Sequence, residues 1–217
     1  PGLLLLAHDA SQWQRHQLLA AERQAQGIPL ELWSPERLGA LEPSIPEGCP
    51  GALWSPRDGQ LDAAAALEQW RIDGRRLGLE ELAVAAGRLE PTGAQWRLHL
   101  ATGEVRQAEA VVLAAGLELA DLWPEAAATP APVLRPVLGQ ALELQLQADD
   151  PDPARWPGSL AWCGINLVPR PGRRLWLGAT LEPGALAADG ALEALRTLHG
   201  QAPPWLRRAV VLRHWQG

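Results

Sequence analysis

The feature that most constrains the fold is an apolar run without alternation, Ala-Val-Val-Leu-Ala-Ala-Gly, at residues 110–116. Such a run predicts a strand that is buried on both faces of a parallel sheet. A glycine at the end of the strand lets the backbone approach a ligand and turn into a helix, which we expect over residues 117–122. Because ligands of open α/β sheets lie at the carboxyl ends of strands, Gly116 indicates a ligand site. A plain core strand is the alternative.

Length and charge limit the classes of protein to consider. The chain has 217 residues, of which 47% are hydrophobic and 20% charged, a balance typical of a folded protein with a sizeable core. A net charge of −6 without a basic cluster disfavours nucleic acid as the main partner. No apolar run reaches the roughly 18 residues that a membrane helix needs.

Residue usage is unusual. The sequence contains no Phe, Tyr or Met but eleven Trp, so we expect Trp and Leu to fill the aromatic places of the core. The bias indicates a GC-rich gene, and the lack of an initiator Met suggests a segment of a longer chain. Cys49 and Cys163 are isolated, which predicts two unpaired thiols in a reducing compartment.

Local signals predict the elements that precede the apolar run. Capping residues place one helix over residues 12–26, after Asp9 or Ser11, and a second one that begins after Asp62. Gly74 lies in the apolar stripe of the second helix and would allow close approach to a sheet. Ser34-Pro35 opens a further short helix that closes around residues 41–43. Apolar runs and turn residues predict strands over residues 3–7, 30–33, 51–54 and 79–85, and a hairpin of 96–100 with 104–107.

The pattern changes after Pro124. Residues 125–132 form an Ala/Pro-rich connector, and Leu alternates with polar residues over 142–146, as in a half-exposed antiparallel strand. We expect a hairpin of residues 165–170 with 174–180, an amphipathic helix over 189–199 and a last strand over 209–215. The fold class is therefore α/β with an α+β part, built on a mixed sheet.

The residues do not form a catalytic constellation on their own. The five histidines have no partner at metal-ligand spacing, so we expect them to be solvated and predict no metal site. Asp58 and Asp62 could form an acid pair, but a turn and a helix cap explain both. Catalytic residues stay unassigned, and if the chain is catalytic, a cofactor must carry the reaction.

Several segments together resemble one family, the D-amino-acid oxidase superfamily of FAD enzymes, with the glycine oxidase of thiamine biosynthesis as the nearest branch. The pairing of Leu167-Val168-Pro169-Arg170 with Gly178-Ala179-Thr180 is the most specific element. The other segments are Pro1-Gly2-Leu3-Leu4-Leu5-Leu6-Ala7, Leu41-Glu42-Pro43, Asp58-Gly59-Gln60-Leu61-Asp62, Val111-Val112-Leu113-Ala114-Ala115-Gly116, Pro136-Val137-Leu138-Gly139-Gln140 and Trp215-Gln216-Gly217.

The resemblance covers the middle of the family's chain. It implies part of an FAD/NAD(P)-binding Rossmann-like domain at residues 63–124 and a substrate domain with a large antiparallel sheet at 125–217, with residues 1–62 as a further part of the substrate domain. The family's N-terminal GxGxxG turn and the C-terminal segment that brings an arginine for the substrate carboxylate are not in these 217 residues. We therefore expect an incomplete chain that is inactive alone.

The resemblance also implies site residues. Ala114, Ala115 and Gly116 match the strand end that lies near the dinucleotide, and Ala86 lies near where the family's backbone meets adenine. Asn166 stands where glycine oxidases often have a substrate-lining Tyr, and Leu181 stands where an apolar side chain closes the pocket. Arg170 resembles a carboxylate ligand, but its place in a Pro-Arg-Pro-Gly turn favours a structural role.

The implied activity is FAD-dependent oxidation of glycine or a similar small amine to the imine, with dioxygen reduced to peroxide, in the thiamine thiazole pathway. The expected partners are the amine or amino-acid substrate and dioxygen, the expected location is the cytoplasm, and a homo-oligomer is compatible with the family. Two alternatives stay open: a relative that acts on sarcosine, proline or D-amino acids, and a non-catalytic remnant that serves as an interaction module.

Overall fold

The fold is seen in a computed structural model that describes residues 2–41, 44–124, 127, 129–184 and 186–217. The chain divides into two compact units, one of Pro1–Leu61 with Val137–Gly217 and one of Asp62–Pro136. Glu42 and Pro43 of the Leu41-Glu42-Pro43 segment, and part of the connector expected at 125–132, lie outside the described residues. Each unit is described by itself below.

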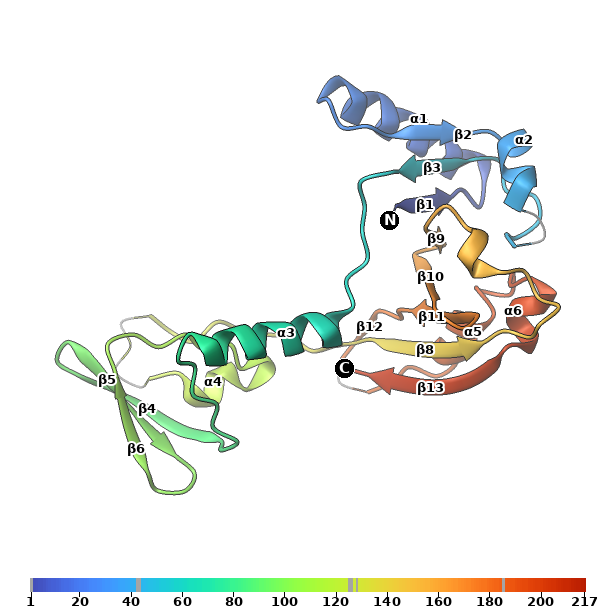
Figure 1. The fold of residues 1–217 in the computed structure, drawn as a ribbon. Helices are drawn as coiled ribbons and strands as arrows, with labels where there is room; N and C mark the ends of the chain where they lie inside the picture. The colour runs from blue at the N-terminus through green and yellow to red at the C-terminus, as the bar shows by residue number, and fades with distance from the viewer. Residues whose placement is uncertain (1, 42–43, 125–126, 128, 185) are drawn as a thin grey trace. The chain divides into compact units, whose positions relative to one another are not determined.

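The first unit is built on an eight-stranded sheet in the order β13-β8-β11-β10-β9-β1-β3-β2 (Figure 1). Its strands pair antiparallel except β1 with β9, which pair in parallel. The strands are β1 (Leu3–Leu6), β2 (Glu31–Trp33), β3 (Ala52–Ser55), β8 (Gln140–Gln145), β9 (Ser159–Trp162), β10 (Ile165–Arg170), β11 (Arg174–Gly178) and β13 (Val210–Gln216). The mixed sheet confirms the expected fold class.

Short helices accompany this sheet. They are α1 (Ala10–Ala25), α2 (Pro35–Leu38), α5 (Ala191–Arg196), α6 (Pro204–Arg208) and the 3-10 turns η1 (Gly39–Leu41) and η3 (Pro153–Arg155); β7 (Val137–Leu138) and β12 (Glu182–Pro183) form a separate pair. The Asp9 carboxylate accepts from the Gln12 amide, so Asp9 is the N-cap of α1. Leu195 of α5 and Leu206 of α6 pack with Leu175 and Leu177 of β11 in the main core.

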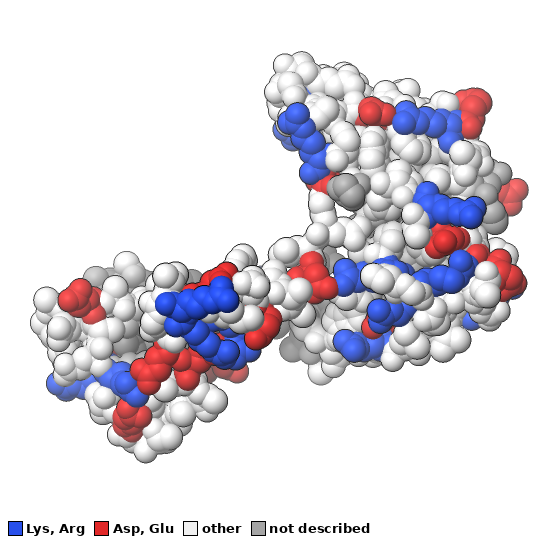
Figure 2. Space-filling view, viewed as in Figure 1, with Lys and Arg blue, Asp and Glu red and all other residues white. Residues whose placement is uncertain are grey.

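The second unit consists of α3 (Ala63–Arg76), the antiparallel sheet β4 (Ala86–Thr92), β5 (Gln95–Leu100) and β6 (Val105–Ala108), and the pair η2 (Gly116–Glu118) and α4 (Leu119–Leu122). The predicted hairpin is confirmed as β5–β6. Asp62 caps α3 through the Ala65 amide at 3.1 Å. Basic and acidic side chains lie next to one another over α3 in Figure 2.

The strand predicted over residues 79–85 is wrong. This segment folds back on α3, because the Leu79 amide donates to the Gly74 carbonyl at 2.8 Å. Gly74 thus permits the close approach of Leu79 and not of a sheet. A Cβ added at Gly74 would lie 2.8 Å from Leu79 Cδ2. The carboxylate of Glu81 accepts from Arg71 and Arg75, which lower the pKa of Glu81 to about 2.

The strand predicted over residues 110–116 is also wrong. Residues 110–115 belong to no strand, and Gly116 begins η2. Within the described part of this unit the sheet consists of three antiparallel strands. It therefore contains no parallel strand with which residues 110–116 could form hydrogen bonds. Val112 is 89% exposed, whereas Val111 and Leu113 line an apolar cavity of about 330 Å³. The short helix expected after the run is present as η2 and α4.

Candidate functional site

Over β8, β10, β11 and β13 the large sheet has one face covered by helices and one open face. Further along the sheet, over β1 and β3, the second face is covered by α1, whose Ala20 packs with Leu5 and Leu53. Along β11, Leu175 and Leu177 are fully buried on the covered face, so Trp176 and Gly178 lie on the open face, since side chains alternate along a strand. The neighbouring strand β10 follows the same alternation, which places Asn166 on the open face opposite Gly178. The open face thus carries a predicted substrate residue.

Four residues from four adjacent strands form a row on the open face. Asn166 pairs with Gly178, Gly178 with Ala141, and Ala141 with Trp215. A Cβ added to Gly178 would lie 2.9 Å from the Ala141 Cβ, so these two positions form a floor on which larger side chains do not fit. The row thus has an amide at one end, an indole at the other and a small-residue floor between them.

Aromatic and charged groups flank this row. The Trp176 and Trp215 rings meet edge to face, with centroids 5.9 Å apart, and the Arg170 guanidinium lies 3.9 Å from the centroid of the Trp176 ring. Arg170 thus has a structural contact, as the turn sequence favoured. The cation also keeps its positive charge near the open face, where it attracts anions.

A buried carboxylate stands in the neighbouring row. Glu143 pairs across the strands with Trp176 and with Arg213, and its Oε1 accepts from Arg174 Nη1 at 2.8 Å, while Arg213 Nε lies 3.9 Å from Oε2. This ion pair explains why the alternating strand β8 buries a charged residue that the sequence pattern places on an exposed face. Together with Arg170, the face carries three guanidinium groups against one carboxylate.

A polar network lies at the ends of the same strands. The Glu182 carboxylate accepts from the Gln140 amide at 2.8 Å, from the Ala188 backbone N–H at 2.5 Å and from the Thr180 hydroxyl. These donors lower the pKa of Glu182, with the Thr180 hydroxyl as the largest cause. His214 Nε2 lies 3.0 Å from Gln140 Oε1. The network connects β8, β13 and the segment after β11, and therefore fixes the backbone next to the row.

The second predicted substrate residue lies elsewhere on the unit. Leu181 is 83% exposed and lines a cavity of about 490 Å³ together with Cys163, Ile165 and His199. Asn166 is not among the residues that line this cavity. The structure therefore places the two predicted substrate residues on different surfaces of the β10–β11 hairpin region, and their shared role stays a prediction.

The predicted cofactor residues all lie in the second unit. Ala114 and Ala115 have irregular backbone, and Gly116 has φ +58° with open space where a Cβ would be. Within the described part of the chain, none of the three amides from Ala114 to Gly116 donates a hydrogen bond. Free backbone N–H groups beside a glycine fit the close approach of a dinucleotide. Ala86, in contrast, begins β4 and pairs with Leu100.

The other titratable groups do not form a reaction centre. Among the described residues no group of three potential metal ligands comes together, and Cys49 and Cys163 are free thiols. The expectation of solvated histidines is wrong for His16, which is 7% exposed. It lies about one helical turn before Ala20, which packs with Leu53 of β3, and burial lowers the pKa of His16.

Sequence reasoning missed Trp176, Trp215 and the small floor of Ala141 and Gly178. Trp176 could have been found, because Leu175 and Leu177 alternate with it on a strand already expected to pair with that of Asn166. Trp215 could not, because its neighbour β8 lies 70 residues away in the chain and the register is set by tertiary packing. Within the described part of the chain, no helix is long and apolar enough to span a membrane.

Comparison with known proteins agrees with this architecture. Residues 1–217 match the family described as "DAO: FAD dependent oxidoreductase". The bifunctional protein ThiO/ThiG of Synechocystis sp. is 29% identical over 168 residues, which are 77% of this chain and 24% of that protein. The similarity is therefore confined to about a quarter of that relative's length.

Solved structures share the fold along the entire chain. Glycine oxidase from Bacillus cereus superposes with a TM-score of 0.82 at 16% identity, over 100% of this chain and 59% of that one. Glycine oxidase from Geobacillus kaustophilus gives 0.81 at 21% over 100% and 58%, and L-proline dehydrogenase from P. horikoshii gives 0.80 at 16% over 100% and 59%. The chain thus spans about three-fifths of these structures, and it belongs to the DAO family of FAD-dependent oxidoreductases.

Proposed function

We propose that this chain is the central part of an FAD-dependent oxidase of glycine or a similar small amine, with the substrate held against the open face of the large sheet. The observation that carries the proposal is the row of Asn166, Gly178, Ala141 and Trp215. A floor without side chains beyond Cβ leaves room for a small substrate, and the family membership supplies the redox class.

Each part of the row has a distinct task in this proposal. The Asn166 amide can donate to a carboxylate or accept from an amine. Trp215 forms an apolar wall that excludes water on one side, and the guanidinium groups of Arg170, Arg174 and Arg213 favour a substrate with a carboxylate. The chain orients the substrate without a side-chain acid or base.

The cofactor is proposed from the family to which the chain belongs. Bound FAD would supply the redox chemistry, as the acceptor of a hydride from the substrate α-carbon with dioxygen as the final oxidant and peroxide as its product. We propose that the free amides of Ala114, Ala115 and Gly116, within a partial FAD-binding domain at 63–124, contribute to its binding. Ala86 stays a weaker candidate because its backbone is paired with Leu100 in the β4–β5 ladder.

The biological setting is proposed from the relatives. The similarity to a bifunctional ThiO/ThiG protein supports a place in thiamine thiazole formation, which would put the enzyme in the cytoplasm. A second candidate substrate class, secondary amines such as sarcosine and proline, is supported by the fold match with an L-proline dehydrogenase. A non-catalytic interaction module is the third candidate.

The test uses the full product of the gene, purified with its flavin, and measures peroxide release with glycine, sarcosine, D-alanine and L-proline. We expect peroxide with glycine, and we expect Asn166→Leu to lower kcat/KM about 10- to 100-fold, as for the loss of one hydrogen bond to a charged group. Gln14→Leu, at an exposed amide on α1, is the matched control and should leave kcat/KM unchanged.

The alternatives give different results. Preference for sarcosine or proline would replace glycine by the secondary-amine class, and reduction of a dye without peroxide would indicate a dehydrogenase. A full-length protein that binds no flavin would favour the interaction module. If Asn166→Leu and Gln14→Leu behave alike in an active enzyme, the substrate does not lie on the open face.

A further inference from the structure

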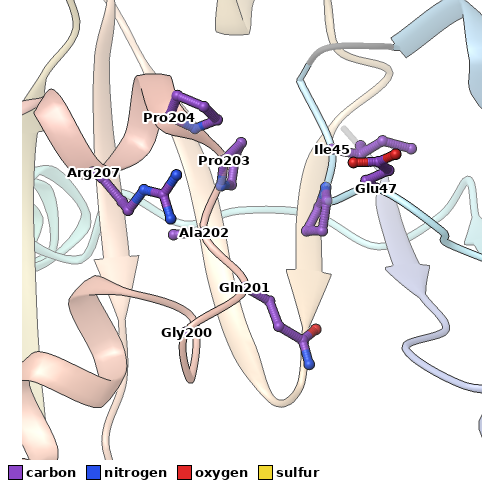
Figure 3. A pocket seen from close by; sticks show the side chains of 9 residues that line it. Ile45, Glu47, Gly200, Gln201, Ala202, Pro203, Pro204 and Arg207 are labelled. Carbon is purple, nitrogen blue, oxygen red and sulfur yellow. The ribbon is translucent and has the colours of Figure 1, made fainter.

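A second site of the first unit is a cavity of about 580 Å³ between the segment 45–47 and the segment 200–207 (Figure 3). Its lining combines polar and apolar groups; the apolar part includes Ile45, 6% exposed, and Ala202, 3% exposed, with Pro46 and Pro203 buried beside them. A volume of this size lies in the range of small-molecule sites. None of these residues belongs to the open face of the sheet, so the site is separate from the one proposed above.

The wall formed by α6 is held rigidly. The Arg196 guanidinium donates to the carbonyls of Leu206, Arg207 and Ala209, with Arg207 O at 3.0 Å. Leu206 is fully buried in the main core and holds α6 against it. On the approach to α6, the Ala202 amide donates to the Thr197 carbonyl at 2.7 Å. A wall fixed in this way loses little conformational entropy when a ligand binds.

Charges of opposite sign face the cavity from its two sides. Figure 3 shows Arg207 on the α6 wall and Glu47 on the opposite wall, with the apolar residues between them. In the described part of the chain, neither side chain makes a hydrogen bond or an ion pair. The neighbouring Arg208 differs, since its guanidinium binds Asp149 at 2.8 Å and Asp150. Arg207 is thus available for a ligand anion, and Glu47 for a ligand cation.

We infer that this cavity binds an aliphatic zwitterion whose carboxylate and ammonium are separated by a carbon chain. The carboxylate would contact Arg207, the ammonium would contact Glu47, and the chain would cover Ile45, Ala202 and Pro203. An α-amino acid carries both charges on one carbon, whereas Arg207 and Glu47 lie on opposite sides of the cavity, so a ligand with separated charges suits the site better. A ligand with a single charge leaves one of the two protein charges without a partner.

The inference is tested by saturation-transfer NMR titration of the purified protein with 6-aminohexanoate, hexanoate, hexylamine and leucine. We expect saturable binding of 6-aminohexanoate. The affinities of the other three compounds should be lower by about fivefold or more, as for one lost charge contact at an exposed site. Arg207→Gln and Glu47→Gln should each weaken 6-aminohexanoate about fivefold. Arg155→Gln and Glu22→Gln, at exposed positions outside the cavity, should have no effect.

Three outcomes would overturn the inference: no saturable binding of 6-aminohexanoate, binding of hexanoate or leucine with equal affinity, or equal affinities in the cavity and control variants. A second measurement keeps the test valid if a cavity variant folds poorly. The affinity of the unmodified protein for 6-aminohexanoate should fall as salt rises, because both contacts are ionic and partly exposed. The result is independent of flavin binding and of peroxide release, so the proposed oxidase activity and this site can fail separately.

Discussion

The floor of the open face predicts a specific coupling between two residues, Gly178 and Ala141. A Cβ added at Gly178 would lie 2.9 Å from the Ala141 Cβ and 3.7 Å from its Cα. Carbon atoms that are not bonded prefer a separation of about 3.5–4.0 Å. In the variant Gly178→Ala, the two strands must therefore separate locally by roughly 0.6 Å or more, or their side chains must tilt.

The expected cost follows from two opposing effects. Overpacking of this kind costs about 1–3 kcal/mol, and replacing glycine within a strand returns roughly 0.5–1 kcal/mol. We expect Gly178→Ala to lower the free energy of unfolding by about 1 kcal/mol. Ala141→Gly should lower it by about 0.5–1 kcal/mol, because it introduces a flexible residue into β8 without relieving any strain.

The double variant tests whether the loss of stability comes from the contact between the two Cβ atoms or from each substitution separately. Ala141→Gly with Gly178→Ala exchanges the two residues and removes the Cβ–Cβ clash, so its stability should return close to that of the unmodified chain. The coupling energy of the cycle is then about 1.5 kcal/mol. Urea unfolding followed by tryptophan fluorescence measures all four proteins. Additive effects of the two substitutions would refute the packing argument and, with it, the small-residue floor.

Three further predictions concern caps, carboxylates and thiols. Asp62→Ala should cost about 1 kcal/mol of helix stability by removing the acceptor of the Ala65 amide, and circular dichroism during urea unfolding should show that Asp62→Asn largely restores it. The pKa of Glu182 is lowered, so its stabilising effect is present above the unfolded value of about 4.5 and is lost as pH falls through the lower native value; Glu182→Gln should flatten the loss of urea resistance below pH 4.5. Burial raises the pKa of the thiols of Cys49 and Cys163, and at pH 8 a thiol reagent should label the more exposed Cys163 first and Cys49 only on unfolding.

Elements that depend on local signals could be predicted from the sequence. The caps Asp9 and Asp62 accept from backbone amides as expected, and the turn at Pro171-Gly172 joins the expected hairpin of β10 and β11. These signals act within four residues of one another, so the unfolded chain already contains the information.

Elements that depend on distant partners could be predicted less well. The apolar spacing of residues 79–85 is compatible with a strand, but the Gly74 carbonyl and the arginines of α3 bind the segment instead. The same holds for the candidate site. The family resemblance points to Asn166, whereas the position of Trp215 in the same row depends on the register of β13 against β8, which local sequence does not determine.

The run at residues 110–116 shows what an apolar pattern does and does not determine. An unbroken run specifies that both faces of a segment are to be covered by apolar atoms. Val111 and Leu113 have such neighbours in the cavity that Trp96 and Trp123 also line, but Val112 is 89% exposed, so only one of its two faces is covered within the described part of the second unit. A segment that is apolar on both faces and covered on one retains an exposed surface able to bind. The free amides that follow it at Ala114–Gly116 lie at the end of that surface, and this supports the proposal that the dinucleotide binds this segment while the substrate binds the open face of the large sheet.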